Sequence, residues 1–193
     1  MRKMTQGSIA RHLIAYALPL ILGNLFQLTY NAVDSIVIGK FAGENALAAV
    51  SAANPVMTIV ILGVSGVSIG ASVLMSRFYG AGDDAGMRRT YGLMTVGTQA
   101  ASLLFMLAAL LFPEGIVRLF SPDEQVVALG SSYLRIIALS YPFLALTRGG
   151  GTLLQSTGRV MIPFVGSLIS VAVNIVLNAL LIFGLCGFPA LGV

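Results

Sequence analysis

The sequence predicts an all-α membrane protein, a polytopic helical bundle with about five transmembrane helices. Of the 193 residues, 57% are hydrophobic and only 9% are charged, whereas roughly a quarter of the residues in a soluble domain are charged. The mean hydropathy is +0.93. Long apolar runs alternate with short polar connections, and each run is long enough to cross a bilayer as a helix.

The five expected spans are apolar runs that end at polar or glycine-rich connections. Their ranges are 13–38, 46–75, 91–112, 126–147 and 160–183. The first contains Pro19, which membrane helices tolerate. Its 26 residues reach about 39 Å at ~1.5 Å per residue, enough to cross a hydrocarbon core of about 30 Å with some tilt. Two shorter helices in its place would not cross.

The connections are expected to be loops, the most polar at 77–90 and others at 114–125 and 149–159. Ser121–Pro122–Asp123–Glu124 is typical of a helix start, with Ser121 as the cap and acidic residues in the first turn. Inside the second span, Gly66 and Gly70 form a small-xxx-small pair. We expect that pair to pack against another helix.

The basic residues predict an orientation with the N-terminus in the cytoplasm. The inside segments then carry eight lysine and arginine residues and the outside segments only Lys40 and Arg118, in keeping with the positive-inside rule. The net charge of +4 forms no basic face on a soluble domain, which argues against a nucleic-acid partner. Arg135 lies within the fourth span and Arg148 closes it.

The first span carries a polar stripe with a carboxylate at membrane depth. Asn24, Gln27, Asn31 and Asp34 follow at spacings of three, four and three, so they share one helix face. Tyr30, one turn before Asp34, borders this stripe. An acidic side chain at the centre of a membrane helix costs about 2.5–3.5 kcal/mol, which makes a functional role the default hypothesis. Desolvation disfavours the charged form, so Asp34 is suited to hold a proton or exchange it for a cation.

The fifth span has a second polar face, formed by Ser170, Asn174 and Asn178 at four-residue spacing. If the two spans pack together, Tyr30, Asn174 and Asn178 add neutral oxygens to the Asp34 carboxylate. Such a donor set suits Na⁺ better than a divalent ion.

The remaining polar residues of the two faces are expected to line a cavity. They are Asn24, Gln27, Asn31 and Ser170. The alternative is that these side chains only join neighbouring helices by hydrogen bonds.

An enzyme is not expected. The sequence shows no nucleophile beside a base, no metal-ligand spacing and no intact nucleotide loop, because Gly80–Ala81–Gly82 has neither a preceding strand nor a following GK[ST]. The lone Cys186 forms no internal disulfide. The only cofactor expected is the coupling ion, H⁺ or Na⁺. The expected partners are the lipid bilayer and small organic molecules.

Four stretches in order resemble the multidrug and toxic compound extrusion (MATE) transporters. Residues 17–51 (ALPLILGNLFQLTYNAVDSIVIGKFAGENALAAVS) are similar to the first helix and following loop of that family, and 76–89 (SRFYGAGDDAGMRR) to the loop after the second helix. Residues 133–143 (YLRIIALSYPF) and 174–184 (NIVLNALLIFG) resemble parts of the fourth and fifth helices. The resemblance covers nearly the whole chain.

This resemblance implies a cation-coupled antiporter of two six-helix lobes around a central cavity, in a bacterial-type cytoplasmic (inner) membrane. The chain would supply five of the six helices of the N-terminal lobe, and the C-terminal lobe would be missing. Asp34 matches the family's proton or Na⁺ site, Tyr30 a tyrosine that joins it, and Asn174 a fifth-helix asparagine. Family members carry an aspartate where this chain has Asn178, which leaves the choice between H⁺ and Na⁺ open.

The expected function is efflux of amphipathic, often cationic organic compounds in exchange for H⁺ or Na⁺. One alternative is a lipid-linked saccharide flippase of the same superfamily, for which Arg135 and Arg148 are the only basic cavity candidates. Another is an inactive half-transporter or non-transporting subunit. The sequence ends on FPALGV without a polar tail, which suggests a cut within a longer protein.

Overall fold

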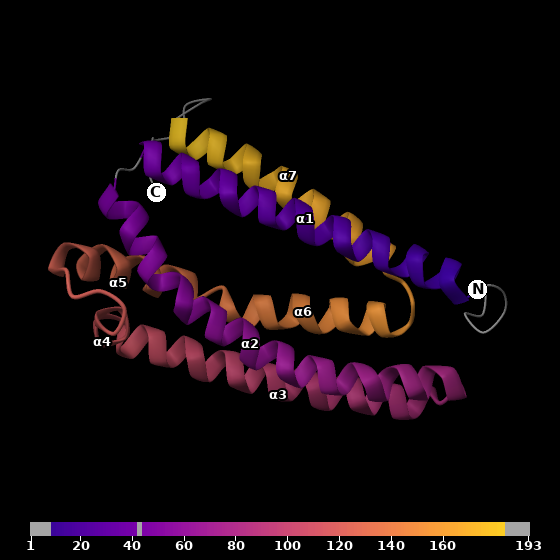
Figure 1. Ribbon diagram of the computed structural model, residues 1–193. Coiled ribbons are helices and arrows are strands. Elements are labelled where there is room, and N and C mark those ends of the chain that lie inside the picture. Colours follow the sequence, from indigo (N-terminus) through magenta and orange to yellow (C-terminus); the bar gives the residue numbers. More distant parts are fainter. Residues whose placement is uncertain (1–8, 42–43, 184–193) are drawn as a thin grey trace. The chain divides into compact units, whose positions relative to one another are not determined.

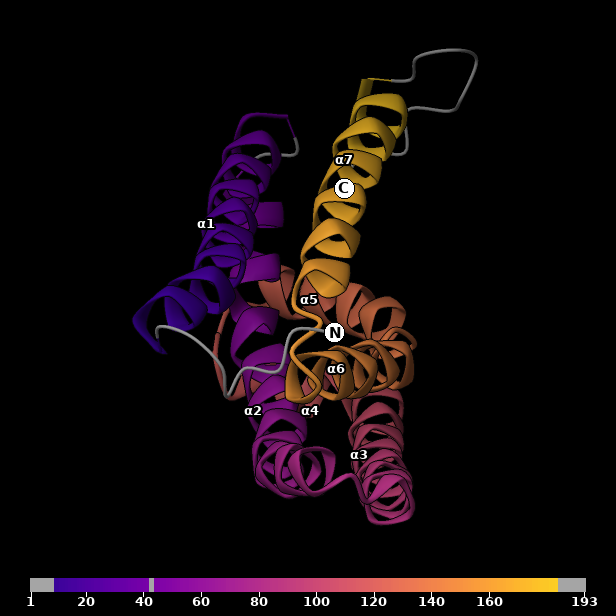
Figure 2. The same cartoon turned by 90° about the vertical axis from the view of Figure 1, so that its right-hand side faces the viewer.

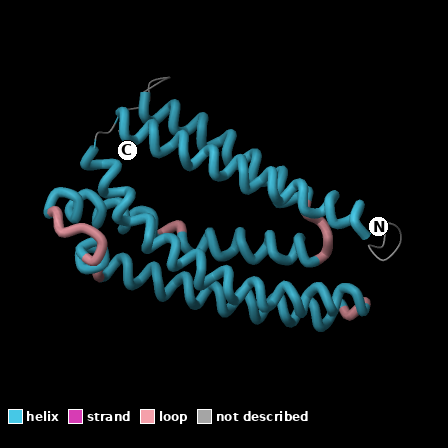
Figure 3. Tube along the Cα trace, in the orientation of Figure 1, coloured by secondary structure: helices cyan, strands magenta, loops and turns pink. Residues whose placement is uncertain are grey.

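The structure, a computed structural model, describes residues 9–41 and 44–183, and within them helices are joined by short loops and turns (Figure 3). The helices are α1 (Ile9–Phe41), α2 (Glu44–Ala81), α3 (Asp84–Leu111), α4 (Pro113–Arg118), α5 (Glu124–Ala138), α6 (Tyr141–Ser156) and α7 (Met161–Phe183) (Figure 1). No strand occurs in these ranges. The all-α prediction is confirmed.

Three described helices are long and apolar enough to cross a membrane, at Ala10–Val33, Leu47–Ala81 and Asp84–Leu111. The pair α5 and α6 makes a fourth crossing if it counts as one span, and α7 adds the shorter apolar stretch Met161–Leu177. These helices establish the polytopic membrane class. The chain forms two compact units, Met1–Val37 with Gly158–Val193, and Ile38–Thr157.

The second unit is built around α2, which packs against α3, α5 and α6. Its core includes Val60 from α2, Val117 from α4, Leu134 from α5 and Tyr141 from α6, all fully buried. Gly130 allows α5 to approach closely, because a Cβ there would lie 3.1 Å from Val117 Cγ1 and 3.4 Å from the Ala49 carbonyl oxygen.

The α2–α3 connection is far shorter than the loop predicted at 77–90, and that prediction is wrong. Helix α2 continues to Ala81 and α3 begins at Asp84. Gly82 makes the turn with a φ of +74°, a conformation that glycine adopts without strain. Asp83 caps α3, its Oδ1 accepting a 2.9 Å hydrogen bond from the Gly86 amide. The turn and the cap let the polar residues on both sides of it form helix.

The glycines at 149–151 do not begin a loop, as the sequence had suggested, because α6 runs through them to Ser156. Gly149 is buried, and a Cβ there would lie 3.4 Å from Met94 Cε on α3. The glycine therefore serves packing between α6 and α3. The turn that follows uses Gly158, with a φ of +76°.

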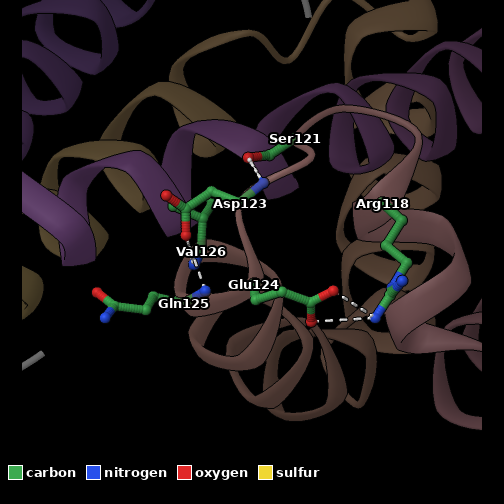
Figure 4. Close-up of polar contacts among 6 residues, drawn as sticks. All are labelled: Arg118, Ser121, Asp123, Glu124, Gln125 and Val126. Atoms are coloured by element: carbon green, nitrogen blue, oxygen red, sulfur yellow. Dashed lines mark hydrogen bonds and ion pairs between the residues drawn. The ribbon is translucent and has the colours of Figure 1, made fainter.

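The predicted loop at 114–125 contains the short helix α4 and a capped start of α5 (Figure 4). Asp123, rather than Ser121, is the cap: its Oδ1 accepts hydrogen bonds from the amides of Gln125 at 2.8 Å and Val126 at 3.2 Å. Arg118 forms a 3.1 Å ion pair with Glu124 across this connection.

The region of the fourth predicted span, 126–147, contains two helices, α5 and α6, which meet at a bend of 49°. Pro142 has no amide hydrogen to donate to the Ala138 carbonyl, which favours a break in the helix at this position. Helix α5 closes with a tightened turn, in which the Ser140 amide bonds to the Ile137 carbonyl at 2.9 Å.

The sequence predicts that Gly66 and Gly70 pack against another helix. Among the described residues, no atom approaches either glycine closely. A Cβ at either position would meet no atom within 4 Å. The buried face of α2 is formed instead by larger residues such as Val60, Val64 and Met75.

Candidate cation site on helices α1 and α7

Helices α1 and α7 lie side by side and run in the same direction (Figures 1 and 2). A Cβ at Gly23, midway along α1, would lie 3.5 Å from Phe164 Cδ2 and 3.6 Å from Ser167 Oγ in the first turns of α7. Seven residues after Gly23 on α1 and seven residues after Ser167 on α7, the side chains of Tyr30 and Asn174 form a hydrogen bond. Because both contacts advance in the same order, the two helices are parallel.

A hydrogen bond joins the two helices at the polar stripe. The Tyr30 hydroxyl donates to Asn174 Oδ1 over 2.5 Å. Tyr30 is half-buried and Asn174 is exposed. The structure thus brings together two of the residues that the sequence assigns to the cation site, from positions 144 residues apart.

The other two predicted cation ligands, Asp34 and Asn178, lie within α1 and α7, but their side chains are outside the described part of the chain. Their backbone positions follow from the register. Each comes four residues after a member of the Tyr30–Asn174 pair, so both lie one turn further along the parallel helices, about 6 Å at ~1.5 Å per residue. The assignment of these two residues stays a prediction.

The predicted cavity-lining residues are all exposed. They are Asn24, Gln27 and Asn31 on α1 and Ser170 on α7. No hydrogen bond among the described residues joins these side chains to another helix. Nearby hydroxyl groups instead bond to their own helix, Thr29 to the Leu25 carbonyl and Ser35 to the Asn31 carbonyl, both at 2.9 Å.

The distance between the Tyr30 hydroxyl and the Asn174 amide oxygen is that of a hydrogen bond. The Tyr30 hydroxyl hydrogen occupies one lone pair of the Asn174 amide oxygen, and the two oxygens come from two different helices.

Sequence reasoning missed the contact at Gly23. The sequence pattern that indicates this contact is a spacing of seven residues. Gly23 precedes Tyr30 by seven residues, and Ser167 precedes Asn174 by seven. Seven residues are close to two helical turns, so each pair shares a face. A small residue two turns from a polar contact is the pattern that would have predicted the packing.

The family model described as MatE matches residues 19–180, a range that includes most of α1 and α7 and every predicted site residue. The chain belongs to the MatE family. The MatE match thus extends over both compact units.

Curated relatives carry names from drug resistance. The chain is 30% identical over 192 residues to "Probable multidrug resistance protein YoeA" of Bacillus subtilis (strain 168), covering 100% of this chain and 42% of that protein. It is 29% identical over 180 residues to "Multidrug export protein MepA" of Staphylococcus aureus (strain bovine RF122 / ET3-1), covering 93% of this chain and 40% of that protein. This MatE chain spans about two fifths of the length of these relatives.

Proposed function

We propose that this chain is part of a multidrug efflux antiporter, which exports amphipathic and cationic organic compounds in exchange for H⁺ or Na⁺. The MatE membership and the relatives named for multidrug resistance and export support efflux as the activity. The observation that carries the mechanism is the hydrogen bond between Tyr30 and Asn174. It joins α1 and α7 one turn before Asp34.

In this proposal Asp34 holds the coupling proton or Na⁺. Tyr30, Asn174 and Asn178 supply neutral oxygens around it. Desolvation in the membrane raises the free energy of a lone charged carboxylate. Binding of a proton or a cation is therefore favoured. Binding of Na⁺ competes with the Tyr30–Asn174 hydrogen bond, because the ion and the hydroxyl hydrogen both bind to lone pairs of the same oxygen atoms. The change of contact between α1 and α7 then releases the drug.

The exposed residues Asn24, Gln27, Asn31 and Ser170 line the substrate cavity together with a second lobe outside this chain. The relatives are more than twice as long as the chain, which supports such a lobe. We place the chain in a bacterial-type inner membrane with its N-terminus in the cytoplasm. In this orientation the excess of Lys and Arg lies on the cytoplasmic side. No catalytic step and no further cofactor are required.

The test is efflux of ethidium from cells that make the complete gene product, energised by a proton or Na⁺ gradient. We expect Asp34→Asn to abolish gradient-driven efflux, because the amide neither binds a proton nor neutralises a cation. The matched control is Asp84→Asn, an exposed carboxylate in the first turn of α3, which should retain efflux. Unchanged efflux in Asp34→Asn would contradict the proposal. Sensitivity at Arg135 and Arg148 in that case would favour the flippase alternative.

A further inference from the structure

Four large apolar side chains at the end of α3 and after α4 are exposed, two in the last residues of the predicted third span and two in the polar connection that follows it. Leu111 is 69% exposed, Phe112 67%, Leu119 80% and Phe120 42%. We call these four residues the apolar cap. They lie within ten residues of one another, on either side of α4.

The apolar cap belongs to an ordered element. Helix α4 packs against α5, and Pro113 and Val117 are its buried residues. Gly130 on α5 approaches Val117 so closely that a Cβ would come within 3.1 Å. The ion pair between Arg118 and Glu124 links α4 to the start of α5 on the surface (Figure 4). The buried side of α4 thus fixes its position, and the cap residues remain on the outside.

The length of α3 gives the level of the cap in the membrane. Arg88 and Arg89 stand near its beginning, and the stretch from Thr90 to Leu111 carries no charged residue. This stretch is 22 residues long, about 33 Å at ~1.5 Å per residue, close to the ~30 Å thickness of the hydrocarbon core. Leu111 therefore lies where the hydrocarbon core meets the headgroups.

The cap continues a lipid-facing surface along α3. That surface consists of Leu93, Val96, Leu104 and Leu107, all between 51% and 70% exposed. Apolar side chains exposed along a membrane span face lipid. The chain passes from this surface through Leu111 and Phe112 directly into α4.

We propose that the apolar cap is an interfacial anchor, which inserts Leu119 and Phe120 into the boundary between acyl chains and headgroups. Short amphipathic elements bind at this level by burying apolar side chains while their polar residues stay hydrated. The charges around α4 are Glu114, Arg118, Asp123 and Glu124, a net negative set. Attraction to anionic lipids is therefore not the source of binding, and the anchor is hydrophobic.

The chain contains no tryptophan, so one introduced tryptophan reports its own surroundings. The experiment uses Leu119→Trp in the full chain, reconstituted in phosphatidylcholine vesicles that contain brominated lipids. The control is Ala85→Trp, an exposed position between Asp84 and Arg88 at the other end of α3. We expect bromine near the headgroup end of the acyl chains to quench Leu119→Trp more than bromine near the chain terminus. Iodide in the buffer should quench Ala85→Trp and spare Leu119→Trp.

Three outcomes overturn the anchor. Quenching of Leu119→Trp by iodide and not by bromolipid places the cap in water. Protection from both quenchers means that protein covers it, either a second copy or a second lobe. Bromolipid quenching that appears only when phosphatidylglycerol is added means electrostatic attraction. Phe120→Trp is the second variant and should behave as Leu119→Trp does.

Discussion

The Tyr30 hydroxyl donates a 2.5 Å hydrogen bond to the amide oxygen of Asn174, which joins the first and last described helices at their polar faces. Both residues stand one turn before the positions at which the sequence places a carboxylate and a second amide. The bond is therefore a reporter of the site, because its strength depends on how α1 and α7 meet. It also gives a direct stability test.

A double-mutant cycle on Tyr30→Phe and Asn174→Ala measures this bond. Hydrogen bonds between membrane helices average about 0.6 kcal/mol and reach about 1.7, so we expect a coupling free energy in that range. The measurement is unfolding of the chain in mixed micelles. Asn24→Ala, at an exposed position on α1, should be additive with Tyr30→Phe. Additivity between Tyr30→Phe and Asn174→Ala as well would mean that the bond is not formed.

Tyr141→Phe should stabilise the second unit. Tyr141 is fully buried, and its hydroxyl has no hydrogen-bond partner among the described residues. A buried polar group without a partner costs about 1–3 kcal/mol, so we expect a gain of about 1 kcal/mol in the free energy of unfolding. Tyr141→Leu is the control, since it removes the ring as well and should destabilise. A loss of stability in Tyr141→Phe would mean that the hydroxyl has a partner.

Gly86→Ala should destabilise the α2–α3 turn. The new Cβ would lie 2.5 Å from Asp83 Oδ2 and 2.7 Å from Phe78 Cδ1, so the cap carboxylate or the ring must move. Overpacking of this kind costs about 1–3 kcal/mol. In Gly92→Ala, also on α3, the Cβ meets nothing within 4 Å, and removing a helical glycine should add up to about 1 kcal/mol. Thermal unfolding distinguishes the two, and equal effects would contradict the turn geometry.

Asp123→Ala should weaken the start of α5, because the carboxylate accepts both described cap hydrogen bonds. Loss of a capping side chain costs about 0.5–2 kcal/mol. Ser121→Ala should have a smaller effect, since the Ser121 hydroxyl makes only a 3.4 Å contact with the Asp123 amide. Hydrogen exchange of the Gln125 and Val126 amides is the measurement. Faster exchange in Ser121→Ala than in Asp123→Ala would mean that Ser121 is the capping residue, as the sequence predicts.

The sequence predicts the membrane class and the polar faces well because both depend on local pattern. Spacings of three and four residues place Asn24, Gln27 and Asn31 on one face whatever the rest of the chain does. The contact between Tyr30 and Asn174 does not follow from local pattern. It depends on how two distant helices pack, and periodicity alone allows many pairings.

Sequence reasoning is least accurate where helices end. Polarity suggested a loop at 77–90, yet polar sequences also form helices in water, and only a segment within the hydrocarbon core must be apolar. The Asp83 cap and the left-handed Gly82 decide the turn there. At Gly149 the close packing against Met94 outweighs the low helix propensity of glycine. Tertiary contacts of this kind are not visible in a hydropathy pattern.

Release of a bound dye by the coupling cation tests the proposed mechanism most directly. The complete gene product in detergent is loaded with ethidium, and Na⁺ or a shift to acidic pH is then applied while fluorescence anisotropy is followed. The mechanism predicts that the wild-type protein releases the dye on one of these additions and that Asp34→Asn retains it. Equal release from both proteins would show that Asp34 does not exchange the cation for the drug.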